Sequence, residues 1–403
     1  MEGCFAGVDW ASEEHACCVV DAGGRIVEGR RYRHDERGLR ALCARLLGLG
    51  VELVAVERPD GLLVERLLDA GLSVIAVHPN QVAAMRPRFT AAGGKSDSFD
   101  SFVLAELART DSHRYRVLVP DSDETKALRA LSRAREDLVR TRVALANELR
   151  AQLECYWPGA VKVFAEIDSP IALQFLKRYP SPADAQGLGE QRMARFLARN
   201  HYCGRKPASE LLGRLRGAAQ GRAQALESEA RRQIVLALVD ALEPIVARIS
   251  ELESEIRSAL TDHLDGPTFR SLFKDPKSVV TAASLLSEMG DCRDRYPTNA
   301  ALAADGGQAP VAVESGKFKR ARFRWACDHR LRAAICTLAD ASRHHNPWAA
   351  DIYTRAIARG CTHQHAIRIL GRAWCGVIWR LWQDRDVYDP ARHTGLQRLL
   401  AAS

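Results

Sequence analysis

In the first 110 residues, short apolar segments and amphipathic segments follow one another in a regular order. Period-2 or continuous apolar patterns predict strands, and apolar residues recurring every three or four positions predict helices. Gly23-Gly24 forms a hairpin turn between the second and third strands. A loop is predicted at 86–94, after which Ser96 or Asp97 caps the last helix. The predicted strands are 4–10, 15–21, 25–33, 51–56 and 72–77, and the predicted helices are 36–48, 61–70 and the residues up to about Thr110.

The resulting order is β-β-β-α-β-α-β-α. Three antiparallel strands followed by two parallel strands with helical crossovers form the ribonuclease H-like arrangement. The run 51–56 is apolar at nearly every position, as a strand buried on both faces requires. The sequence therefore predicts an α/β domain over residues 1–115.

Four acidic residues stand at related positions of this predicted domain. Asp9 ends the first strand, Glu57 ends the fourth, and Asp97 and Asp100 lie three residues apart at the start of the last helix. In such a sheet they can converge at one edge. Clustered carboxylates repel one another unless cations neutralise them, and two Mg²⁺ ions about 4 Å apart are a common solution in phosphodiester chemistry. The pattern predicts a metal site.

Each acid also has a simpler explanation. Asp97 can be a helix N-cap and Asp100 a first-turn acid, both of which stabilise the helix dipole. Asp9 and Glu57 are harder to explain in this way, because an acid that ends an apolar strand has no capping role. The four residues together favour the metal site.

Residues 116–265 are predicted to be helical. One long helix covers 123–156, five prolines break 158–220 into short helices and loops, and a further long helix covers about 221–263. Apolar residues in the last of these step by three and four, the a/d spacing of a coiled coil. The seam can pair with a second chain or with the 123–156 helix of the same chain, so this region is a rigid spacer or a dimerisation arm. The seam residues are Val235, Leu238, Leu242, Ile245, Ile249, Leu252 and Ile256.

The charge of the chain is uneven. Residues 1–110 carry 13 Lys+Arg and 16 Asp+Glu, which is a net −3, whereas residues 266–403 carry 21 and 12, a net +9. An acidic front and a basic rear suggest that carboxylate chemistry and the binding of a polyanion are separated along the chain.

A basic and aromatic segment, 317–325, is the strongest nucleic-acid signal of the basic region 266–403. Cations alternate with aromatic residues in an extended, strand-like pattern, and this composition suits contacts to phosphates and to bases. The alternative is an edge strand whose charges prevent aggregation. The predicted nucleic-acid-binding residues are Lys317, Lys319, Arg320, Arg322 and Arg324.

Ser315 stands beside a glycine just before this segment. In a cationic loop such a serine is either a turn residue or a nucleophile. Composition alone leaves both open.

Membrane insertion and a disulfide framework are not expected. No apolar run approaches the roughly 18 residues of a spanning helix. The eleven cysteines are scattered without a C-x-x-C pair, which argues against a disulfide framework and a zinc ribbon. We expect a soluble, cytoplasmic protein without a membrane partner.

Several motifs resemble those of a known family, the DEDD-motif transposases of the insertion-sequence one-hundred-ten type, which are RNA-guided recombinases. Segments 7–11, 56–61 and 95–100 look like the family's RuvC-like metal motifs. Segments 309–317 and 388–390 are similar to its C-terminal motifs, and the order and spacing of the motifs match along the whole chain. The resemblance implies a RuvC-like domain of ribonuclease H fold, a central long-helix coiled-coil region, and a mostly α C-terminal transposase domain at 266–403.

The resemblance also implies a composite active site. Asp9, Glu57, Asp97 and Asp100 would hold Mg²⁺ as two ions, with Mn²⁺ as a possible substitute, while Ser315 attacks DNA and forms a phosphoserine link. The expected partners are donor and target DNA, a guide (bridge) RNA, and further copies of the chain as a homodimer that assembles to a tetramer. The expected location is the cytoplasm, in association with the nucleoid.

Two other functions remain open from the residues. A RuvC-like metal-dependent nuclease or junction resolvase would use the acids with water and would not need Ser315. A non-catalytic nucleic-acid-binding protein would use the acids only to cap helices.

Overall fold

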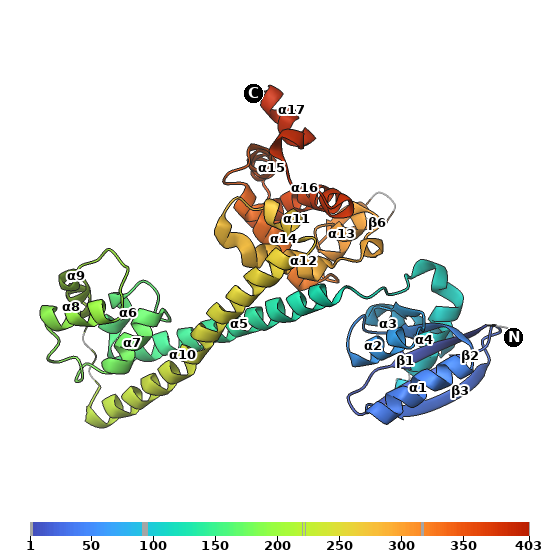
Figure 1. Cartoon of the computed structure of the whole chain (residues 1–403), viewed down its shortest axis with the longest axis horizontal. Coiled ribbons are helices and arrows are strands. Elements are labelled where there is room, and N and C mark those ends of the chain that lie inside the picture. The colour runs from blue at the N-terminus through green and yellow to red at the C-terminus, as the bar shows by residue number, and fades with distance from the viewer. Residues whose placement is uncertain (1–2, 91–95, 220, 222, 316–317, 403) are drawn as a thin grey trace. The chain divides into compact units, whose positions relative to one another are not determined.

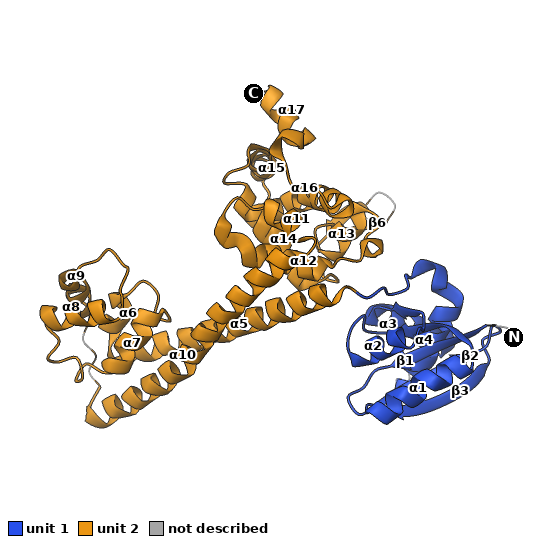
Figure 2. Cartoon of the chain, viewed as in Figure 1, with its two compact units in different colours: residues 1–120 blue, residues 121–403 orange. Residues whose placement is uncertain are grey.

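The computed structural model describes residues 3–90, 96–219, 221, 223–315 and 318–402. The chain divides into two units, Met1–Pro120 and Asp121–Ser403 (Figure 2). Unit 2 contains residues 121–265 of the region predicted to be helical, together with the C-terminal region predicted for 266–403. Their separation into two domains stays a prediction.

Unit 1 is built on a five-stranded sheet with the strand order β3-β2-β1-β4-β5. β1 pairs antiparallel with β2, and β2 with β3, whereas β1 and β4, and β4 and β5, are parallel. This is the predicted arrangement of three antiparallel strands joined to two parallel ones. The strands are β1 (Cys4–Asp9), β2 (Glu14–Val20), β3 (Ile26–Arg33), β4 (Val51–Val56) and β5 (Val74–Ala76).

The central strands are apolar at successive positions because both faces of the sheet are covered. In β4, Val54 and Val56 pack in the cluster that contains α1 and α2, whereas Leu53 and Ala55 pack in the cluster that contains α4. All four residues are buried. Alternate residues of one strand thus serve two different cores, which explains the continuous apolar run. The helices of unit 1 are α1 (Glu36–Gly48), α2 (Leu62–Asp69), α3 (Pro79–Phe89), α4 (Asp97–Asp111) and the short η1 (Ser112–Arg114).

The predicted loop 86–94 is wrong over 86–89, which belong to α3. Proline was taken as a break, yet Pro79 occupies the first turn of α3, where its missing N–H costs nothing. His78 caps this helix by accepting a hydrogen bond from the Asn80 amide at 3.1 Å. Pro87 lies in the last turn. Residues 91–94 of the predicted loop are outside the described residues.

The long helices of unit 2 agree with the prediction. α5 (Asp123–Tyr156) and α10 (Ala225–Asp262) pack along each other, and the Arg135 Nε donates to the Glu253 Oε1 across the pair at 2.9 Å (Figure 1). Six of the seven seam residues are buried, Ile245 being the exception. The helix pairing within one chain is therefore present, and pairing of two chains through α10 stays a prediction.

Two hydrophobic cores flank this helix pair. One gathers around Phe175 and Phe196, where the short helices pack on α5 and α10. The other gathers around Trp374 and Trp382 in the C-terminal region. The short helices are α6 (Pro158–Val163), α7 (Pro170–Arg178), α8 (Glu190–Arg199) and α9 (Ala208–Arg216).

The C-terminal region is mostly helical, with one two-stranded antiparallel sheet. Its strands are β6 (Val311–Ser315) and β7 (Phe318–Arg322), and the extended pattern of the basic segment predicted the second of these. The helices are α11 (Gly266–Ser271), η2 (Pro276–Ser278), α12 (Val279–Met289), η3 (Arg293–Arg295), α13 (Asn299–Asp305), α14 (His329–Ser342), α15 (Pro347–Ala358), α16 (His363–Asp384), η4 (Pro390–Arg392) and α17 (Thr394–Ala402).

None of the described helices combines the length and the apolar composition needed to cross a membrane. The eleven cysteines are free thiols.

Candidate active site

Two of the four predicted acids lie next to each other at one edge of the sheet of unit 1. Asp9 is the last residue of β1, and Glu57 directly follows β4. The two strands are parallel neighbours whose final aligned pair is Val8 and Val56. Because the next residue of each strand continues past this pair, Asp9 and Glu57 leave the sheet side by side. Both are half-buried.

The third acid comes from α4, which packs against β1 and β2. Gly7 makes this close approach possible, since a Cβ at Gly7 would lie 2.1 Å from the Ser101 carbonyl oxygen and 2.3 Å from the Ala105 amide nitrogen. Any larger residue would push the helix away from the strand. Asp100 precedes Ser101 on the same turn, so the glycine holds Asp100 near the carboxyl end of β1.

Asp100 is almost completely buried, with 3% of its surface exposed. Arg86 of α3 binds its carboxylate through two hydrogen bonds, Nε to Oδ1 at 2.6 Å and Nη2 to Oδ2 at 2.8 Å. This bidentate geometry is the strongest form of an arginine–carboxylate pair. A buried carboxylate needs such compensation, because an isolated charge in the interior is very costly.

Arg86 also lies in the field of the other two carboxylates. Its hydrogen bonds to Asp100 raise the pKa of Arg86, and the negative charges of Asp100, Glu57 and Asp9 raise it further against the opposing effect of burial. Three of the four predicted acids therefore act on the same guanidinium group. Asp100 forms hydrogen bonds with Arg86, whereas Asp9 and Glu57 act on Arg86 only through their charge.

Asp97 lies in the first turn of α4 and faces solvent, with about half of its side chain exposed. Its Oδ2 is 3.3 Å from the Nη2 of Arg31, a residue of β3. The suggestion that Asp97 caps the helix is wrong, because the N-cap is Ser96, whose Oγ accepts from the Phe99 amide at 3.2 Å. A first-turn acid such as Asp97 still interacts favourably with the helix dipole.

Asp9, Glu57, Asp97 and Asp100 are called the carboxylate edge below. Their oxygens suit Mg²⁺, which prefers carboxylate oxygens and water as ligands. Among the described residues, however, no group of three or more His, Cys, Asp or Glu is arranged closely enough to hold a metal ion. Both oxygens of Asp100 are engaged by Arg86. A metal ion that takes both of these oxygens must therefore displace the arginine.

Ser315 belongs to unit 2. It is the last residue of β6, it is exposed, and it pairs with Phe318 across the two-stranded sheet. The sequence placed it in a loop, which is wrong: it lies in the strand. The exposed position leaves its hydroxyl accessible to a large substrate.

The basic segment is a solvent-facing strand. Lys319, Arg320 and Arg322 lie on β7 and are exposed, and the half-buried Arg324 follows the strand. The other predicted residue, Lys317, lies outside the described residues. Every residue of β7 is exposed, so this strand contributes its charges to the surface and not to a core.

Two arginines of the carboxylate edge were not identified from the sequence, Arg86 and Arg31. Arg86 stands in the segment that was assigned to a loop, where no side-chain direction can be derived. Arg86 can be placed beside Asp100 only when it is known that residues 79–89 form a helix, α3, that packs on α4. Arg31 lies on β3, and its ion pair with Asp97 joins two segments that are far apart along the chain.

Comparisons with known proteins cover both units. A family model described as "Transposase" matches residues 6–158, and one described as "Transposase IS116/IS110/IS902 family" matches residues 278–354. The four acids fall within the first match, and Ser315 falls within the second.

Curated relatives match along the chain. The "Mini-circle putative transposase for IS117" of Streptomyces coelicolor is 31% identical over 402 residues, with 96% of each chain covered. The "Insertion element IS110 uncharacterized 43.6 kDa protein" of the same organism is 27% identical, with 98% of each chain covered. The "Putative transposase y4uE" of Sinorhizobium fredii is 37% identical over 203 residues, 49% of this chain and 56% of that one.

A solved structure, "T. thermophilus RuvC in complex with Holliday junction substrate", is matched over 29% of this chain and 100% of that chain. The identity is 18% and the TM-score is 0.23, values too low to support an argument about function.

Proposed function

The chain belongs to the IS116/IS110/IS902 family of transposases, and from this premise we propose that it is a Mg²⁺-dependent DNA recombinase in which Ser315 attacks the DNA. A transposase cleaves and rejoins DNA strands. The finer proposal concerns the groups that carry out this reaction and the ion that assists them.

The observation that carries the proposal is the gathering of Asp9, Glu57 and Asp100 at one end of the sheet of unit 1. Carboxylates close to one another repel unless a cation offsets their charge. Groups of interacting titratable side chains are typical of functional sites. Asp97, one turn away from Asp100 on α4, is proposed as the fourth carboxylate of the set.

The carboxylates would bind Mg²⁺ through their oxygens. Bound there, the metal would neutralise the phosphodiester and stabilise the attacking and leaving oxygens. Asp100 would contribute a carboxylate oxygen to the metal, and Arg86, which holds Asp100 in place, is also suited to binding a phosphate oxygen of the DNA.

Ser315 is proposed as the nucleophile. Its Oγ forms a new bond to phosphorus while the bond from phosphorus to a bridging oxygen of the DNA breaks. The serine proton leaves to a base, and the departing DNA oxygen takes up a proton, so that one strand ends in a hydroxyl and the other is linked to the protein. Attack by a DNA hydroxyl on the phosphoserine then rejoins the strands and releases the serine. The proposed reaction uses groups from both units.

The exposed cations Lys319, Arg320 and Arg322 of β7 are proposed to hold the nucleic acid near Ser315, because they lie on the strand that pairs with β6. Arg324 follows the strand, and Lys317 is included in the proposed set from the sequence. Phosphate contacts of this kind position the nucleic acid without reading its sequence.

The decisive experiment is strand cleavage of an insertion-end DNA, followed on a denaturing gel that reveals a protein–DNA adduct. We expect the wild type with Mg²⁺ to form the adduct, and both Ser315→Ala and Asp9→Asn to lose it. Ser258→Ala removes another exposed hydroxyl, on α10, and serves as the matched control that keeps full activity.

The two other functions give different results in the same assay. A nuclease or junction resolvase that uses water would cleave with Ser315→Ala as well as the wild type does, and would form no adduct. A non-catalytic binding protein would cleave under no condition, and Mg²⁺ would have no effect. Either result would refute the serine mechanism.

The guide RNA and the assembly from homodimer to tetramer are proposed from the family resemblance. Copurification and sequencing of bound RNA test the first. The molar mass in solution, measured by light scattering with and without nucleic acid, tests the second.

A further inference from the structure

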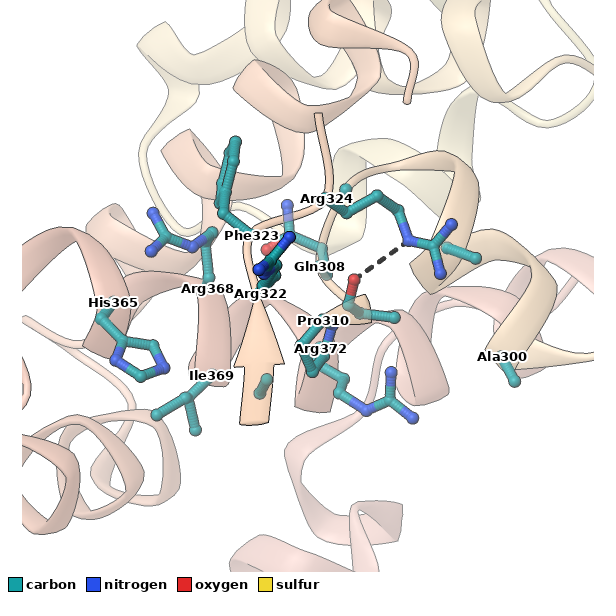
Figure 3. A pocket seen from close by; sticks show the side chains of 14 residues that line it. Ala300, Gln308, Pro310, Arg322, Phe323, Arg324, His365, Arg368, Ile369 and Arg372 are labelled. Carbon is teal, nitrogen blue, oxygen red and sulfur yellow. Dashed lines mark hydrogen bonds between the residues drawn. The ribbon is translucent and has the colours of Figure 1, made fainter. Parts of the chain in front are cut away.

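A cavity of about 790 Å³ lies in unit 2 between the β7 strand and α16 (Figure 3). Its walls come from four segments: α13, the loop 307–310, the end of β7 with the residues that follow, and one face of α16. None of the residues assigned to the active site on unit 1 belongs to it.

The cavity is strongly cationic. His365, Arg368 and Arg372 project from α16 at positions i, i+3 and i+7, which share one helix face. Arg322 and Arg324 approach from β7 and the residue pair beyond it. Among the described residues that line the cavity, four are arginines, one is a histidine, and none is acidic.

These arginines lack the carboxylate partners that most arginines of this chain have. Within the described residues, no carboxylate lies within 4.0 Å of Arg322, Arg368 or Arg372. By contrast, near the C-terminal end of α16, the Arg380 Nε lies 2.6 Å from the Asp384 Oδ2. Several uncompensated cations around one cavity repel one another, and an anion placed between them relieves that repulsion.

Two of the cations are held in position before any ligand binds. The Arg368 guanidinium lies 4.8 Å from the centre of the Phe323 ring, which Arg332 also contacts at 5.1 Å. The Arg324 Nε donates a hydrogen bond to the Ala309 carbonyl oxygen at 3.1 Å (Figure 3). Such fixed side chains lose little conformational entropy on binding, which favours affinity.

An exposed aromatic ring stands beside the cavity. Trp325 is 74% exposed, and its ring packs edge-on against Phe323 at a centroid distance of 4.8 Å. An indole of this kind offers a flat face to which a nucleic-acid base can stack. In a duplex the faces of the bases are covered by their neighbours, so only an unpaired base can use it.

We propose that this cavity binds the sugar–phosphate backbone of a single-stranded nucleic acid, with one unpaired base stacked on Trp325. Arg322, Arg368 and Arg372 contact phosphate oxygens, and Phe323 orients Arg368. The inference rests on the proposed function, in which the chain handles nucleic acid, and adds a binding site for unpaired nucleotides that lies beside the β6–β7 sheet.

The test measures affinity of the full chain for fluorescein-labelled oligonucleotides by fluorescence anisotropy. The probes are a single-stranded DNA, an RNA of the same sequence, and the corresponding DNA duplex. The double variant Arg368→Gln/Arg372→Gln, the cavity variant, is compared with a control variant, Arg359→Gln/Arg380→Gln. The control removes the same charge from two exposed positions outside the cavity, one directly after α15 and one on α16.

Each phosphate contact to a single strand adds about 0.7 to the slope of log affinity against log salt concentration. At about 0.1 M salt this corresponds to roughly fivefold in affinity per contact. We therefore expect the cavity variant to bind single strands about 25-fold more weakly than the control variant, with a slope smaller by about 1.4. Comparison of the single-stranded DNA and RNA probes shows which of the two the cavity prefers. Weaker binding of either probe by the cavity variant than by the control variant supports the proposal.

Two further variants guard against misfolding and test the stacking. Arg372→Gln alone leaves Arg368 on Phe323 and should cost about fivefold. Trp325→Ala should weaken single-strand binding about tenfold and leave duplex binding unchanged. The melting temperature of each variant is measured alongside.

The inference is overturned if the cavity variant binds single strands as tightly as the control variant, or if Trp325→Ala weakens duplex and single strand equally. Binding by the wild type that is insensitive to these variants refutes the cavity alone. A wild type that binds none of the probes refutes the proposed function together with the cavity.

Discussion

Replacing Arg86 by methionine removes the cation that compensates the buried carboxylate of Asp100. Methionine has a similar length and no charge, so the change deletes the two hydrogen bonds to Asp100 while filling much of the same space. Asp100 then keeps a carboxylate that is only 3% exposed and has lost its bidentate partner. Asp9 and Glu57 also lose a nearby positive charge.

The magnitude follows from this burial. Breaking a buried ion pair by removing one partner costs about 3–5 kcal/mol, and because Arg86 keeps 22% of its side chain exposed we expect the lower value, about 3 kcal/mol. With about 2.1 cal/mol/K of unfolding entropy per residue, a unit the size of Met1–Pro120 should melt about 12 °C lower.

Calorimetry of the full chain measures this shift, and hydrogen exchange of peptides from α3 and α4 assigns it to unit 1. Arg31→Gln is the matched control, because it breaks the exposed Arg31–Asp97 pair and should cost less than about 1 kcal/mol. A loss in Arg86→Met no larger than in this control would refute the role of Arg86 as the compensating charge.

The same variant tests the proposed metal site. With the guanidinium absent, Mg²⁺ no longer has to displace a competing cation from Asp100, so added Mg²⁺ should raise the melting temperature of Arg86→Met more than that of the wild type. No rise in either protein would count against metal binding at this edge.

Two further predictions concern stability. Gly7→Ala places a Cβ 2.1 Å from the Ser101 carbonyl oxygen and should lower the free energy of unfolding by about 1–3 kcal/mol in urea titrations. The control is Gly48→Ala, in the last turn of α1 with open space around it, which should change the free energy of unfolding by less than about 1 kcal/mol. Equal effects would show that the position of α4 does not depend on the contact with Gly7. Burial, and to a smaller extent the charge of His34, lowers the pKa of His15 from 6.5 to about 4. The unfolded chain therefore takes up a proton at a higher pH than the folded chain does. The contribution of His15 to stability is complete above pH 6.5 and is lost as the pH falls toward 4. The expected loss is about 3 kcal/mol for this group, and it should be smaller in His15→Gln. Urea midpoints of the wild type and the variant at pH 7 and near pH 4 measure the loss. The same pH dependence in both proteins would contradict this prediction.

Much of the fold of unit 1 was predictable because local patterns carried it. The apolar run of β4, the hairpin at Gly23-Gly24 and the period of α1 each reflect a constraint within a few residues, and the order of the elements fixed the topology. The long helices α5 and α10 were predictable for the same reason. The loop prediction at 86–94 failed over α3 because Pro87 was taken as a helix breaker, whereas it lies in the last turn of a helix that begins at Pro79.

The acids show what a sequence can and cannot provide. The positions of Asp9 and Glu57 after two apolar strands were sufficient to predict that they lie together, since neighbouring parallel strands end at the same edge. The grouping of Asp100 with them in one metal site stays a prediction. The difference in environment between Asp100, which is buried, and Asp97, which faces solvent, follows from how α4 rests on β1 through Gly7.

The sequence by itself determined most of the strands and helices of unit 1 and the long helices of unit 2, the chain positions of the acids and of Ser315, and the basic character of the C-terminal region, because these depend on residue type and short-range spacing. Only the tertiary structure decided that Arg86 binds Asp100 and that one face of α16 joins β7 in a cationic cavity. Both contacts join segments that are separate along the chain, and a side chain acquires such partners only when packing of the apolar cores has fixed the distance and direction between their elements.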